Sequence, residues 1–557
     1  MQNILYKGGI MRIVIIGSVA GGTSAAAKAR RNSEEHEIVI YDMDRDISYS
    51  GCGLPYYIGE DYISRDDLTP RNAAWFKSRF NIDIFTEHKV MEIDFENKML
   101  QVENLVSGET FTDKYDRLVL ATGAVPFIPP IPGINSPNVF PVRSVRDADS
   151  IKKFIIDKKP RKAAIIGGGF IGLEMAENLT LQGIAVSLIE MAEHVMPSMD
   201  RDMAVYIEDH LAEKGVDLFT GDSVKEIADG GRRVVTAKGD EFVTDLVIVA
   251  AGVKPNTGLV KKSGMVTGEH GGIIVDDRME TSIPDVYAVG DCCEVKSTVT
   301  GEYIYRPLGS TANKMGRIAG DAITGGDLRF RGVPGTGIFK VFDLAVAQTG
   351  LSEKEVKEKG IDYLVSHNIK ENQTKYLKES RELVIKCISE AGSDRILGVQ
   401  ITGERGVDKR IDVFVTAMTL GAKTGDLFHL DLAYAPPFSI AKDPVMYTGM
   451  IHESAAHRGR KLITAVELNS GRSNFTVVDV RSSSDYNKGN IEGAVNIPLE
   501  DLKVRSVELD RDAPIVVHCN KGTTANAAQN LLINLGFKEV YNLSGGYSQY
   551  KVEDAPE

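Results

Sequence analysis

An apolar run that enters a glycine-rich turn, RIVIIGSVAGG at residues 12–22, decides the fold of this chain. An alanine-rich segment that predicts a helix follows at residues 23–31. Gly17 permits a tight turn after the strand, and Gly22 permits the helix to pack closely. The N–H groups at the start of such a helix can bind a pyrophosphate. The stretch therefore predicts a dinucleotide site with contacts from Gly17, Ala20, Gly21 and Gly22.

A second stretch of the same kind is AAIIGGGFIG at residues 163–172, followed by an expected helix at 173–181. It is a complete G-x-G-x-x-G pattern formed by Gly167, Gly169 and Gly172, whereas Val19 replaces the middle glycine of the first stretch. One such pattern is weak evidence, but two that each follow an apolar strand and open a helix are strong evidence.

An acid ends the second expected strand of each unit, Asp42 in the first and Glu190 in the second. A carboxylate at this position can accept a hydrogen bond from a ribose hydroxyl. Glu190 would also repel the 2′-phosphate of NADPH, and no arginine follows it immediately. The second unit therefore favours NADH, and NADPH remains open.

Three further apolar runs also end in a turn that contains glycine: LVLATGAVP at 118–126, VIVAAGVKPN at 247–256 and VYAVGD at 286–291. Together with the two units they resemble the two-dinucleotide-binding flavoprotein disulfide reductases over residues 12–447. The resemblance implies FAD in the first fold, NAD(P)H in the second and a C-terminal domain that forms a homodimer. It implies FAD contacts from Thr122, Gly123, Gly290 and Asp291, with Asp291 near the ribityl chain.

Length and composition limit which other classes of protein this chain could belong to. A chain of 557 residues predicts roughly three to four domains. The net charge of −13 gives no electrostatic support for nucleic-acid binding, and the run at 13–16 is too short to cross a membrane. Five irregularly spaced cysteines suggest neither a disulfide framework nor a zinc site. Reduced thiols and the lack of a signal peptide predict the cytoplasm. Residues before Met11 are interpreted as an N-terminal extension.

Cys52 stands alone in SYSGCGLPYY at residues 48–57. No second cysteine follows at short spacing, so a thiol beside a flavin must exchange with an outside sulfur or oxygen atom. That limits the chemistry to a mixed disulfide, a persulfide or a sulfenic acid. As a nucleophile, Cys52 is expected to need a lowered pKa.

This segment is similar to the single-cysteine branch of the superfamily, which includes coenzyme A (CoA) disulfide reductases, CoA persulfide reductases, NADH oxidases and NADH peroxidases. AYAPPFSIAKDP at residues 433–444 resembles the CoA-type members. The resemblance implies that Tyr434, from the partner subunit, and Tyr376 donate a proton or hydrogen bond at Cys52. It also implies a CoA site, to which we assign Ser24, Lys28, Arg31, Ser48 and Lys442. One departure is Gly51, where CoA disulfide members carry asparagine.

The C-terminal region carries four blocks in order: VVDVR at 477–481, GNIEGAVNIP at 489–498, IVVHCNKGTTA at 515–525 and SGGYSQY at 544–550. They resemble a rhodanese domain with Cys519 as the sulfur carrier, in a loop whose N–H groups stabilise a thiolate or persulfide. Asp479 and Arg481 are expected to lock this loop. Asn520 and Thr524 occupy positions where arginines are common, so only Lys521 is positive and thiosulfate should be a poor donor.

These resemblances predict an α/β chain with two Rossmann-like domains, an α/β dimerisation domain and a rhodanese domain. The expected ranges are 11–150 and 256–330 for FAD, 151–255 for NAD(P)H, 331–455 for dimerisation and 462–557 for rhodanese, with a linker at 453–461. Cys292, Cys293 and Cys387 are expected to be buried, and no metal site is expected.

The favoured function is an NADH-dependent reductase of CoA persulfides or polysulfides, in which Cys519 carries sulfur. Direct transfer between Cys519 and Cys52, or transfer through CoA, both remain open. The alternatives are a CoA disulfide reductase, an NADH oxidase or peroxidase, and a redox-sensing binding protein without turnover.

Overall fold

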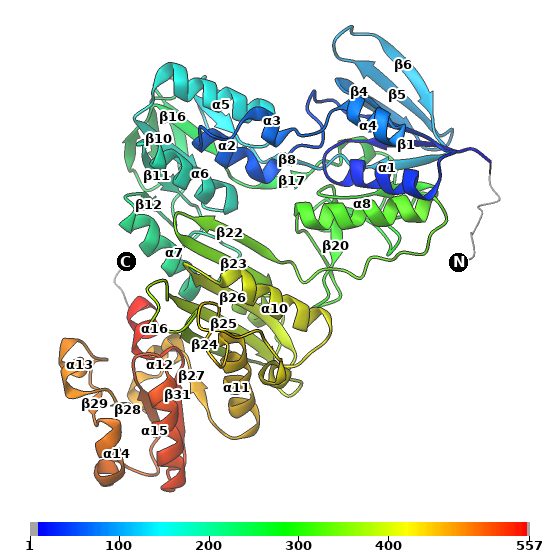
Figure 1. The fold of residues 1–557 in the computed structure, drawn as a ribbon. Coiled ribbons are helices and arrows are strands. Elements are labelled where there is room, and N and C mark those ends of the chain that lie inside the picture. Colours follow the sequence, from blue (N-terminus) through cyan, green and yellow to red (C-terminus); the bar gives the residue numbers. More distant parts are fainter. Residues whose placement is uncertain (1–8, 554–557) are drawn as a thin grey trace. The chain divides into compact units, whose positions relative to one another are not determined.

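The fold was determined as a computed structural model that describes residues 9–553 (Figure 1). The described chain divides into two compact units. The first runs to Glu193 and resumes over Gly215–Val333, and the second comprises His194–Lys214 and the chain from Pro334 onward. Most of the expected N-terminal extension lies outside the described residues.

The first unit contains the sheet predicted from residues 12–22. Its strand order is β19-β7-β1-β2-β3, and all neighbours are parallel. The strands are β1 (Arg12–Ile16), β2 (Glu37–Tyr41), β3 (Asp83–Phe85), β7 (Arg117–Leu120) and β19 (Val286–Ala288). Helix α1 (Gly21–Asn32) starts at Gly21, two residues earlier than expected, and packs against α8 (Gly309–Ile323) (Figure 1).

A second parallel sheet in the same unit has the order β12-β11-β10-β16-β9. Its strands are β9 (Val139–Pro141), β10 (Lys162–Ile166), β11 (Ala185–Ile189), β12 (Asp217–Phe219) and β16 (Leu246–Val249). Helix α6 (Phe170–Leu181) follows β10. Because β9 pairs with β16, a strand from the segment expected in the first FAD range contributes to the second parallel sheet.

Short elements complete this unit. The helices are α2 (Leu54–Gly59), α3 (Arg65–Leu68), α4 (Ala73–Phe80) and α5 (Val145–Lys158). The strands are β4 (His88–Asp94), β5 (Met99–Asn104), β6 (Thr110–Lys114), β8 (Ala124–Pro126), β13 (Val224–Ala228), β14 (Arg233–Thr236), β15 (Glu241–Val243), β17 (Val253–Pro255), β18 (Ile273–Ile274), β20 (Cys293–Lys296) and β21 (Tyr303–Ile304).

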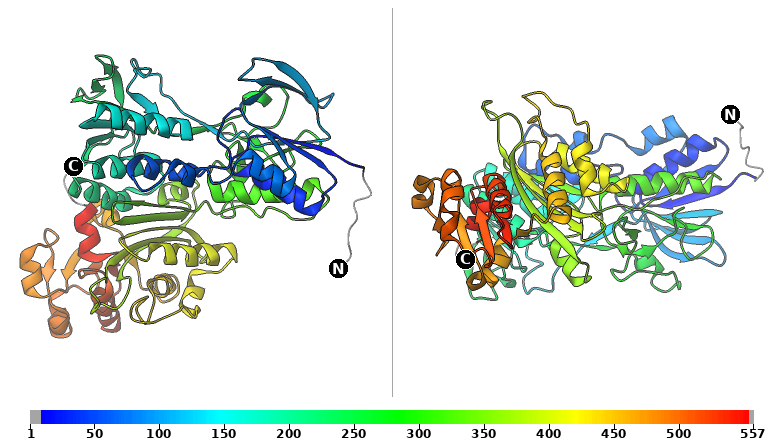
Figure 2. Two further views of the ribbon diagram at one scale, coloured as in Figure 1. Left: turned by 45° about the horizontal axis from the view of Figure 1, so that its top comes forward. Right: turned by 90° about the horizontal axis from the view of Figure 1, so that it is seen from below.

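The second unit is built on an antiparallel sheet of order β22-β23-β26-β25-β24. Helices α10 and α11 lie together against it (Figure 2). The strands are β22 (Gly337–Val341), β23 (Leu344–Gly350), β24 (Tyr363–Glu371), β25 (Glu382–Glu390) and β26 (Ile396–Gly403). The helices are α7 (Arg201–Glu213), α9 (Glu353–Glu358), α10 (Val407–Thr419) and α11 (Pro444–His457).

The last part of the second unit is the expected small α/β fold. Its sheet has the order β27-β31-β30-β28-β29 and is parallel throughout. The strands are β27 (Leu462–Ile463), β28 (Thr476–Asp479), β29 (Val495–Asn496), β30 (Ile515–His518) and β31 (Val540–Leu543). The helices are α12 (Ala465–Ser470), α13 (Ser483–Lys488), α14 (Leu499–Arg505), α15 (Thr523–Asn534) and α16 (Gly546–Glu553).

One boundary expectation was wrong. The polar segment 453–461 was expected to be a linker, but α11 continues to His457, so only the residues after it connect the two folds. His452 explains the continuation, because its ring lies in the core and bonds Ser366 and Ser389 at 2.8 Å.

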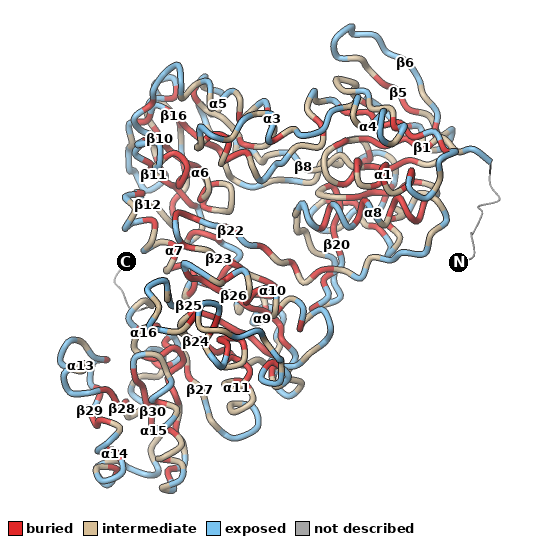
Figure 3. Tube along the Cα trace, viewed as in Figure 1, coloured by how far each residue is buried: buried red, intermediate tan, exposed pale blue. Residues whose placement is uncertain are grey.

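The central strands of each sheet are buried (Figure 3). Cys292, Cys293 and Cys387 lie in these cores with exposed fractions of 0%, 3% and 0%, as predicted. Within residues 9–553, no helix is both long and apolar enough to cross a bilayer.

Candidate functional site

The two glycine turns have the same geometry. Gly17 and Gly167 have φ values of +103° and +108°, in the left-handed region that favours glycine. A Cβ at Gly22 would lie 1.9 Å from the carbonyl oxygen of Gly17, and a Cβ at Gly172 would lie 1.9 Å from that of Gly167. In each of these two strand–turn–helix motifs, the helix thus touches the turn so closely that only glycine fits.

The two predicted acids, Asp42 and Glu190, make equivalent contacts with the two glycine turns. Asp42 accepts hydrogen bonds from Ser18 N at 2.7 Å and from Ser18 Oγ at 2.5 Å. Glu190 accepts one from Gly168 N at 2.6 Å. Each acid therefore fixes the amide that follows the first glycine of its own turn, a role that the sequence did not reveal. Contact with a ribose stays a prediction for both.

The remaining predicted FAD residues lie at adjoining strand ends. Thr122 Oγ1 donates to Asn256 O at 2.6 Å, and Asn256 N donates to Gly123 O at 2.9 Å. These bonds tie the strand ends of 118–126 and 247–256 together. Asp291 follows Gly290, whose φ is +81°, and forms an ion pair with Arg143 at 3.2 Å.

The Cys52 segment is joined to the first glycine turn. Ser48 N donates to Ser18 O at 3.0 Å, and Ser48 has a left-handed φ of +50°. Cys52 is exposed in the short helical turn Gly51–Gly53, immediately before α2. This placement leaves the thiol open to an external sulfur compound.

The chain's own groups do not lower the pKa of Cys52. Although Cys52 is accessible, partial burial of its thiol raises its pKa, the carboxylates of Glu174 and Asp291 raise it further, and Arg143 opposes them. The expectation of a lowered pKa is therefore not met by these side chains. The same interactions place Cys52 in the electrostatic field of the Asp291–Arg143 pair.

Sequence reasoning missed Glu174 and Arg143. Tyr56, four residues after Cys52, donates a hydrogen bond to Glu174 Oε1 at 3.2 Å. Burial raises the pKa of Glu174 to about 7, and Glu177 adds to this effect while Tyr56 opposes it. Glu174 could have been suspected, since it lies two residues after Gly172 on the helix that the second turn opens.

The residues predicted for CoA on α1 form a stripe at helical spacing. Ser24 Oγ donates to Asn313 Oδ1 at 2.7 Å, and the guanidinium of Arg31 lies 5.4 Å from the ring centre of Phe80. The ammonium of Lys28 pairs with Asp321 at 2.9 Å, a contact that the sequence did not predict, and its contact with CoA stays a prediction. A phosphate at Lys28 would have to share this cation with Asp321.

The two predicted tyrosines lie on adjoining loops of the second unit. Tyr376 and Tyr434 are 73% and 52% exposed, and Thr374 N donates to Pro436 O at 3.2 Å between their loops. The buried Arg410 bonds Asn372 O at 2.8 Å in one loop and Asp443 Oδ2 at 2.9 Å beyond the other.

The rhodanese-like loop has the expected form. Ala525 N donates to Cys519 Sγ at 3.3 Å from the first turn of α15, which stabilises a thiolate. Arg481 bonds Asp479 Oδ2 at 2.5 Å and Asn520 Oδ1 at 3.3 Å, so the predicted locking role is confirmed. Lys521 forms an ion pair with Glu382 of β25.

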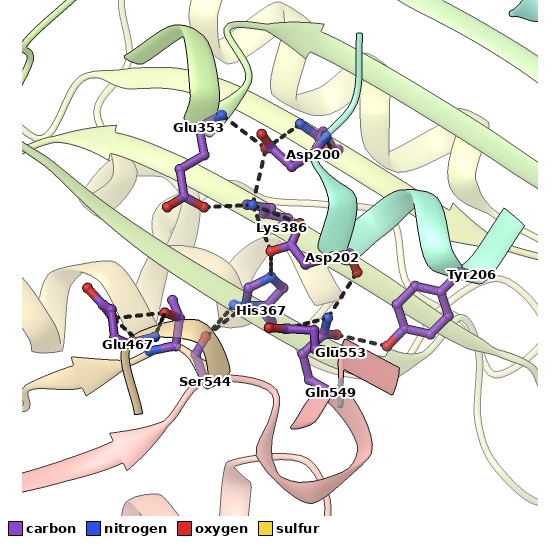
Figure 4. A network of polar contacts seen from close by, with 12 residues as sticks. Asp200, Asp202, Tyr206, Glu353, His367, Lys386, Glu467, Ser544, Gln549 and Glu553 are labelled. Carbon is purple, nitrogen blue, oxygen red and sulfur yellow. Dashed lines mark hydrogen bonds and ion pairs between the residues drawn. The ribbon is translucent and has the colours of Figure 1, made fainter. Parts of the chain in front are cut away.

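A buried polar network joins this fold to the antiparallel sheet (Figure 4). Lys386 bonds both oxygens of Asp202, at 2.9 and 2.7 Å. His367 Nε2 bonds Asp202 at 2.8 Å, and His367 N donates to Ser544 Oγ at 2.6 Å. In the described chain, Asp202, His367 and Glu553 have the spacing of metal ligands, but Lys386 already supplies a positive charge there.

Comparisons with known proteins agree with this architecture. The pattern of the family "Pyridine nucleotide-disulphide oxidoreductase" matches residues 11–311, and that of its dimerisation domain matches 336–444. A rhodanese-like domain pattern matches residues 463–553. The glycine turns, in which a Cβ would strike backbone, fit the FAD and NAD(P)H that this family implies.

Two curated relatives cover the part before the rhodanese-like domain. An NADH oxidase of Methanocaldococcus jannaschii is 36% identical over 78% of this chain and 97% of its own length. A CoA-dependent NAD(P)H sulfur oxidoreductase of Pyrococcus furiosus is 35% identical over 78% of this chain and 97% of its own length.

Two solved structures cover nearly the whole chain. Reduced CoADR-RHD of Bacillus anthracis has a TM-score of 0.96 and 39% identity, covering 98% of this chain and 99% of that one. An NAD-dependent persulfide reductase from A. fulgidus has a TM-score of 0.90 and 39% identity, covering 97% of this chain and 100% of that one.

Proposed function

The chain belongs to the pyridine nucleotide-disulphide oxidoreductase family, and from this premise we propose that it reduces CoA persulfides or polysulfides with NADH. The observation that carries the proposal is a pair of separate thiols. Cys52 is exposed beside the predicted FAD residues, and Cys519 is held by the N–H of Ala525 in a rhodanese-like loop. The names of the persulfide reductase and the sulfur oxidoreductase agree with it.

Overall, CoA persulfide, NADH and a proton would yield CoA, hydrogen sulfide and NAD⁺. When bound, FAD would relay the reducing equivalents of NADH to the sulfur held at Cys52. Cys52, as a thiolate, attacks the substrate sulfur and holds it as a mixed disulfide or persulfide. Arg143 favours this thiolate, whereas Glu174 disfavours it.

The other site residues keep their predicted roles within this proposal. Tyr434 and Tyr376, exposed on adjoining loops, would donate protons to the leaving thiolate from the partner subunit of a homodimer. The match to the dimerisation domain supports such a dimer. Glu190 would favour NADH over NADPH. The cytoplasm is supported by free thiols at all of the chain's cysteines.

The decisive experiment is anaerobic NADH consumption with CoA persulfide and with CoA disulfide at matched concentrations. We expect at least about tenfold faster turnover with the persulfide, and no turnover for Cys52→Ser because the attacking sulfur is gone. Cys519→Ser should impair sulfur transfer while leaving NADH-dependent flavin reduction unchanged. Faster turnover with the disulfide would instead identify a CoA disulfide reductase, and reduced flavin that persists with every sulfur acceptor would identify a redox sensor.

A further inference from the structure

The lysine of the Cys519 loop is already paired with carboxylates of the antiparallel sheet. Lys521 is the only cation in the loop sequence CNKGTT at residues 519–524. Its ammonium forms an ion pair with Glu382 and lies 4.0 Å from Glu371, both on the antiparallel sheet. Because two carboxylates already compensate this charge, Lys521 offers little attraction to an anionic sulfur compound.

A second lysine reaches the same loop from outside the rhodanese-like fold. Lys370, near the end of β24, donates from Nζ to Thr523 Oγ1 at 2.6 Å. Thr523 is the first residue of α15, the helix whose Ala525 N–H bonds Cys519 Sγ. Lys370 therefore stands at the same helix terminus as the sulfur of Cys519.

Lys370 is coupled electrostatically to Cys519, and it lies near a second lysine, Lys442. Burial lowers the pKa of the Lys370 ammonium, while the negative charges of Glu371 and Cys519 raise it and the ammonium groups of Lys521 and Lys442 lower it. Lys370 and Lys442 also share one aromatic ring, since their Nζ atoms lie 4.4 and 5.7 Å from the ring centre of Tyr447. Thus Lys370, Lys442 and the Cys519 thiolate lie within one electrostatic neighbourhood.

We propose that Lys370, assisted by Lys442, forms an anion subsite that binds the negatively charged sulfur donor of Cys519. The subsite replaces the arginines that the loop lacks with lysines supplied by the dimerisation domain. The ligand class is an anionic persulfide or polysulfide, whose charge resides on the sulfur chain or, in CoA persulfide, also on its phosphates. This inference rests on the proposed role of Cys519 as a sulfur carrier.

The reaction that the subsite would serve involves no net oxidation or reduction. The Cys519 thiolate attacks the outer sulfur of R–S–SH, a new S–S bond joins that sulfur to Cys519, and the S–S bond of R–S–SH breaks. The products are Cys519–S–SH and the thiolate R–S⁻, so one negative charge and one proton are conserved. The ammonium of Lys370 attracts the incoming anion and compensates the charge on the departing thiolate.

The test measures sulfur transfer from donors of different charge to cyanide, read as thiocyanate, with the full-length holoenzyme. The donors are CoA persulfide, inorganic polysulfide and cysteamine persulfide, whose amine is positively charged. We expect Lys370→Met to raise KM about tenfold for the two anionic donors, with kcat changed less, and to leave KM for cysteamine persulfide within about twofold. Lys370→Arg should restore most of the affinity because it keeps the charge.

Lys521→Met is the matched control, since it removes a lysine from the loop itself and should leave KM nearly unchanged. A raised KM of Lys370→Met for both anionic donors indicates recognition of the sulfur chain. A raised KM for CoA persulfide alone indicates recognition of its phosphates. Both results support the subsite. Unchanged KM values in Lys370→Met, or a larger loss in Lys521→Met, would overturn it.

A second measurement separates this inference from the proposed function. Alkylation of Cys519 by anionic iodoacetate and neutral iodoacetamide, followed by mass spectrometry of its peptide, needs no turnover. We expect the rate with iodoacetate divided by the rate with iodoacetamide to fall several-fold in Lys370→Met and not in Lys521→Met. An unchanged ratio would refute the anion subsite even if sulfur transfer occurs. A wild-type enzyme that transfers no sulfur would refute the role of Cys519, and the inference with it.

Discussion

Among single residues, Glu174 has the strongest influence on Cys52 that the sequence did not predict. Its carboxylate is the largest electrostatic contribution, after burial, to the raised pKa of the Cys52 thiol. Its own pKa of about 7 means that its charge changes within the physiological range. The reactivity of Cys52 therefore depends on an acid of a different helix, α6, and this acid accepts a hydrogen bond from the hydroxyl of Tyr56.

Glu174→Gln should make Cys52 more reactive, because the neutral amide no longer disfavours a neighbouring thiolate. We expect the midpoint of the pH profile for iodoacetamide alkylation of Cys52 to fall by about one pH unit. Mass spectrometry of the Cys52 peptide measures this rate. Glu96→Gln, at an exposed acid of the same unit, is the control. An unchanged midpoint would contradict the coupling between Glu174 and Cys52.

The same variant carries a stability signature with a definite sign. A carboxyl group whose folded pKa of about 7 exceeds its ordinary value of 4.5 keeps its proton longer in the folded state. The wild-type protein therefore loses stability relative to Glu174→Gln as pH rises from 4.5 through 7. The variant should show a higher relative Tm at pH 8 than at pH 4, and an equal difference at both would be inconsistent with the raised pKa.

At the level of elements, the two strand–turn–helix motifs are predicted to hold different dinucleotides, FAD in the first and NADH in the second. Gly22→Ala and Gly172→Ala each put a Cβ 1.9 Å from a backbone oxygen, so the turn must open. We expect Gly22→Ala to lose most of its FAD during purification, and Gly172→Ala to keep FAD but to show a KM for NADH raised at least about tenfold. Flavin absorbance and NADH titration measure the two effects.

Gly309→Ala is the matched control, because a Cβ at this first residue of α8 meets nothing within 4 Å. It should keep both FAD content and KM for NADH. Equal FAD loss in Gly22→Ala and Gly172→Ala would contradict the separate assignment of the two units.

The sequence predicted these units because their signals are local: an apolar strand, a glycine turn and an acid at the end of the next strand. It also predicted the locking role of Asp479 and Arg481. It could not predict Lys28 with Asp321, or Lys370 with Thr523, because the partners are 293 and 153 residues apart and no local pattern reports them. The linker at 453–461 was misjudged because polar residues also cover the exposed side of a helix end.

For the whole molecule, the Lys386 network shows how the second unit is held together. Lys386 of β25 is 1% exposed and pairs with Asp202 of α7, Asp200 at 3.1 Å and Glu353 of α9 at 2.8 Å. Through His367 the network continues to Ser544, two residues before α16 (Figure 4). Segment 194–214, which follows the second nucleotide unit in sequence, is thus bound into the unit that also contains the rhodanese-like fold.

Lys386→Met should therefore loosen several elements at once. Removal of the ammonium leaves buried carboxylates without their cation, which typically costs about 3–5 kcal/mol of unfolding free energy. Calorimetry should show the loss, and hydrogen exchange should rise in α7 and α16 while β28 and β30 serve as the internal reference. Lys386→Met combined with Asp202→Asn should recover part of the stability, because one uncompensated charge is removed.

The pH dependence of this loss follows from the same contacts. Although burial alone would raise the pKa of Asp202 and of Glu353, Lys386 holds both below their ordinary values of 3.8 and 4.5. Acids with lowered pKa values contribute stability above these values and lose it as pH falls. The difference between wild type and Lys386→Met should thus be largest near neutral pH and shrink below pH 4.5. A difference that stays constant down to pH 3 would show that Lys386 stabilises the unit by packing rather than by charge, since a contribution from charge must shrink as pH falls below the ordinary pKa values of the two acids.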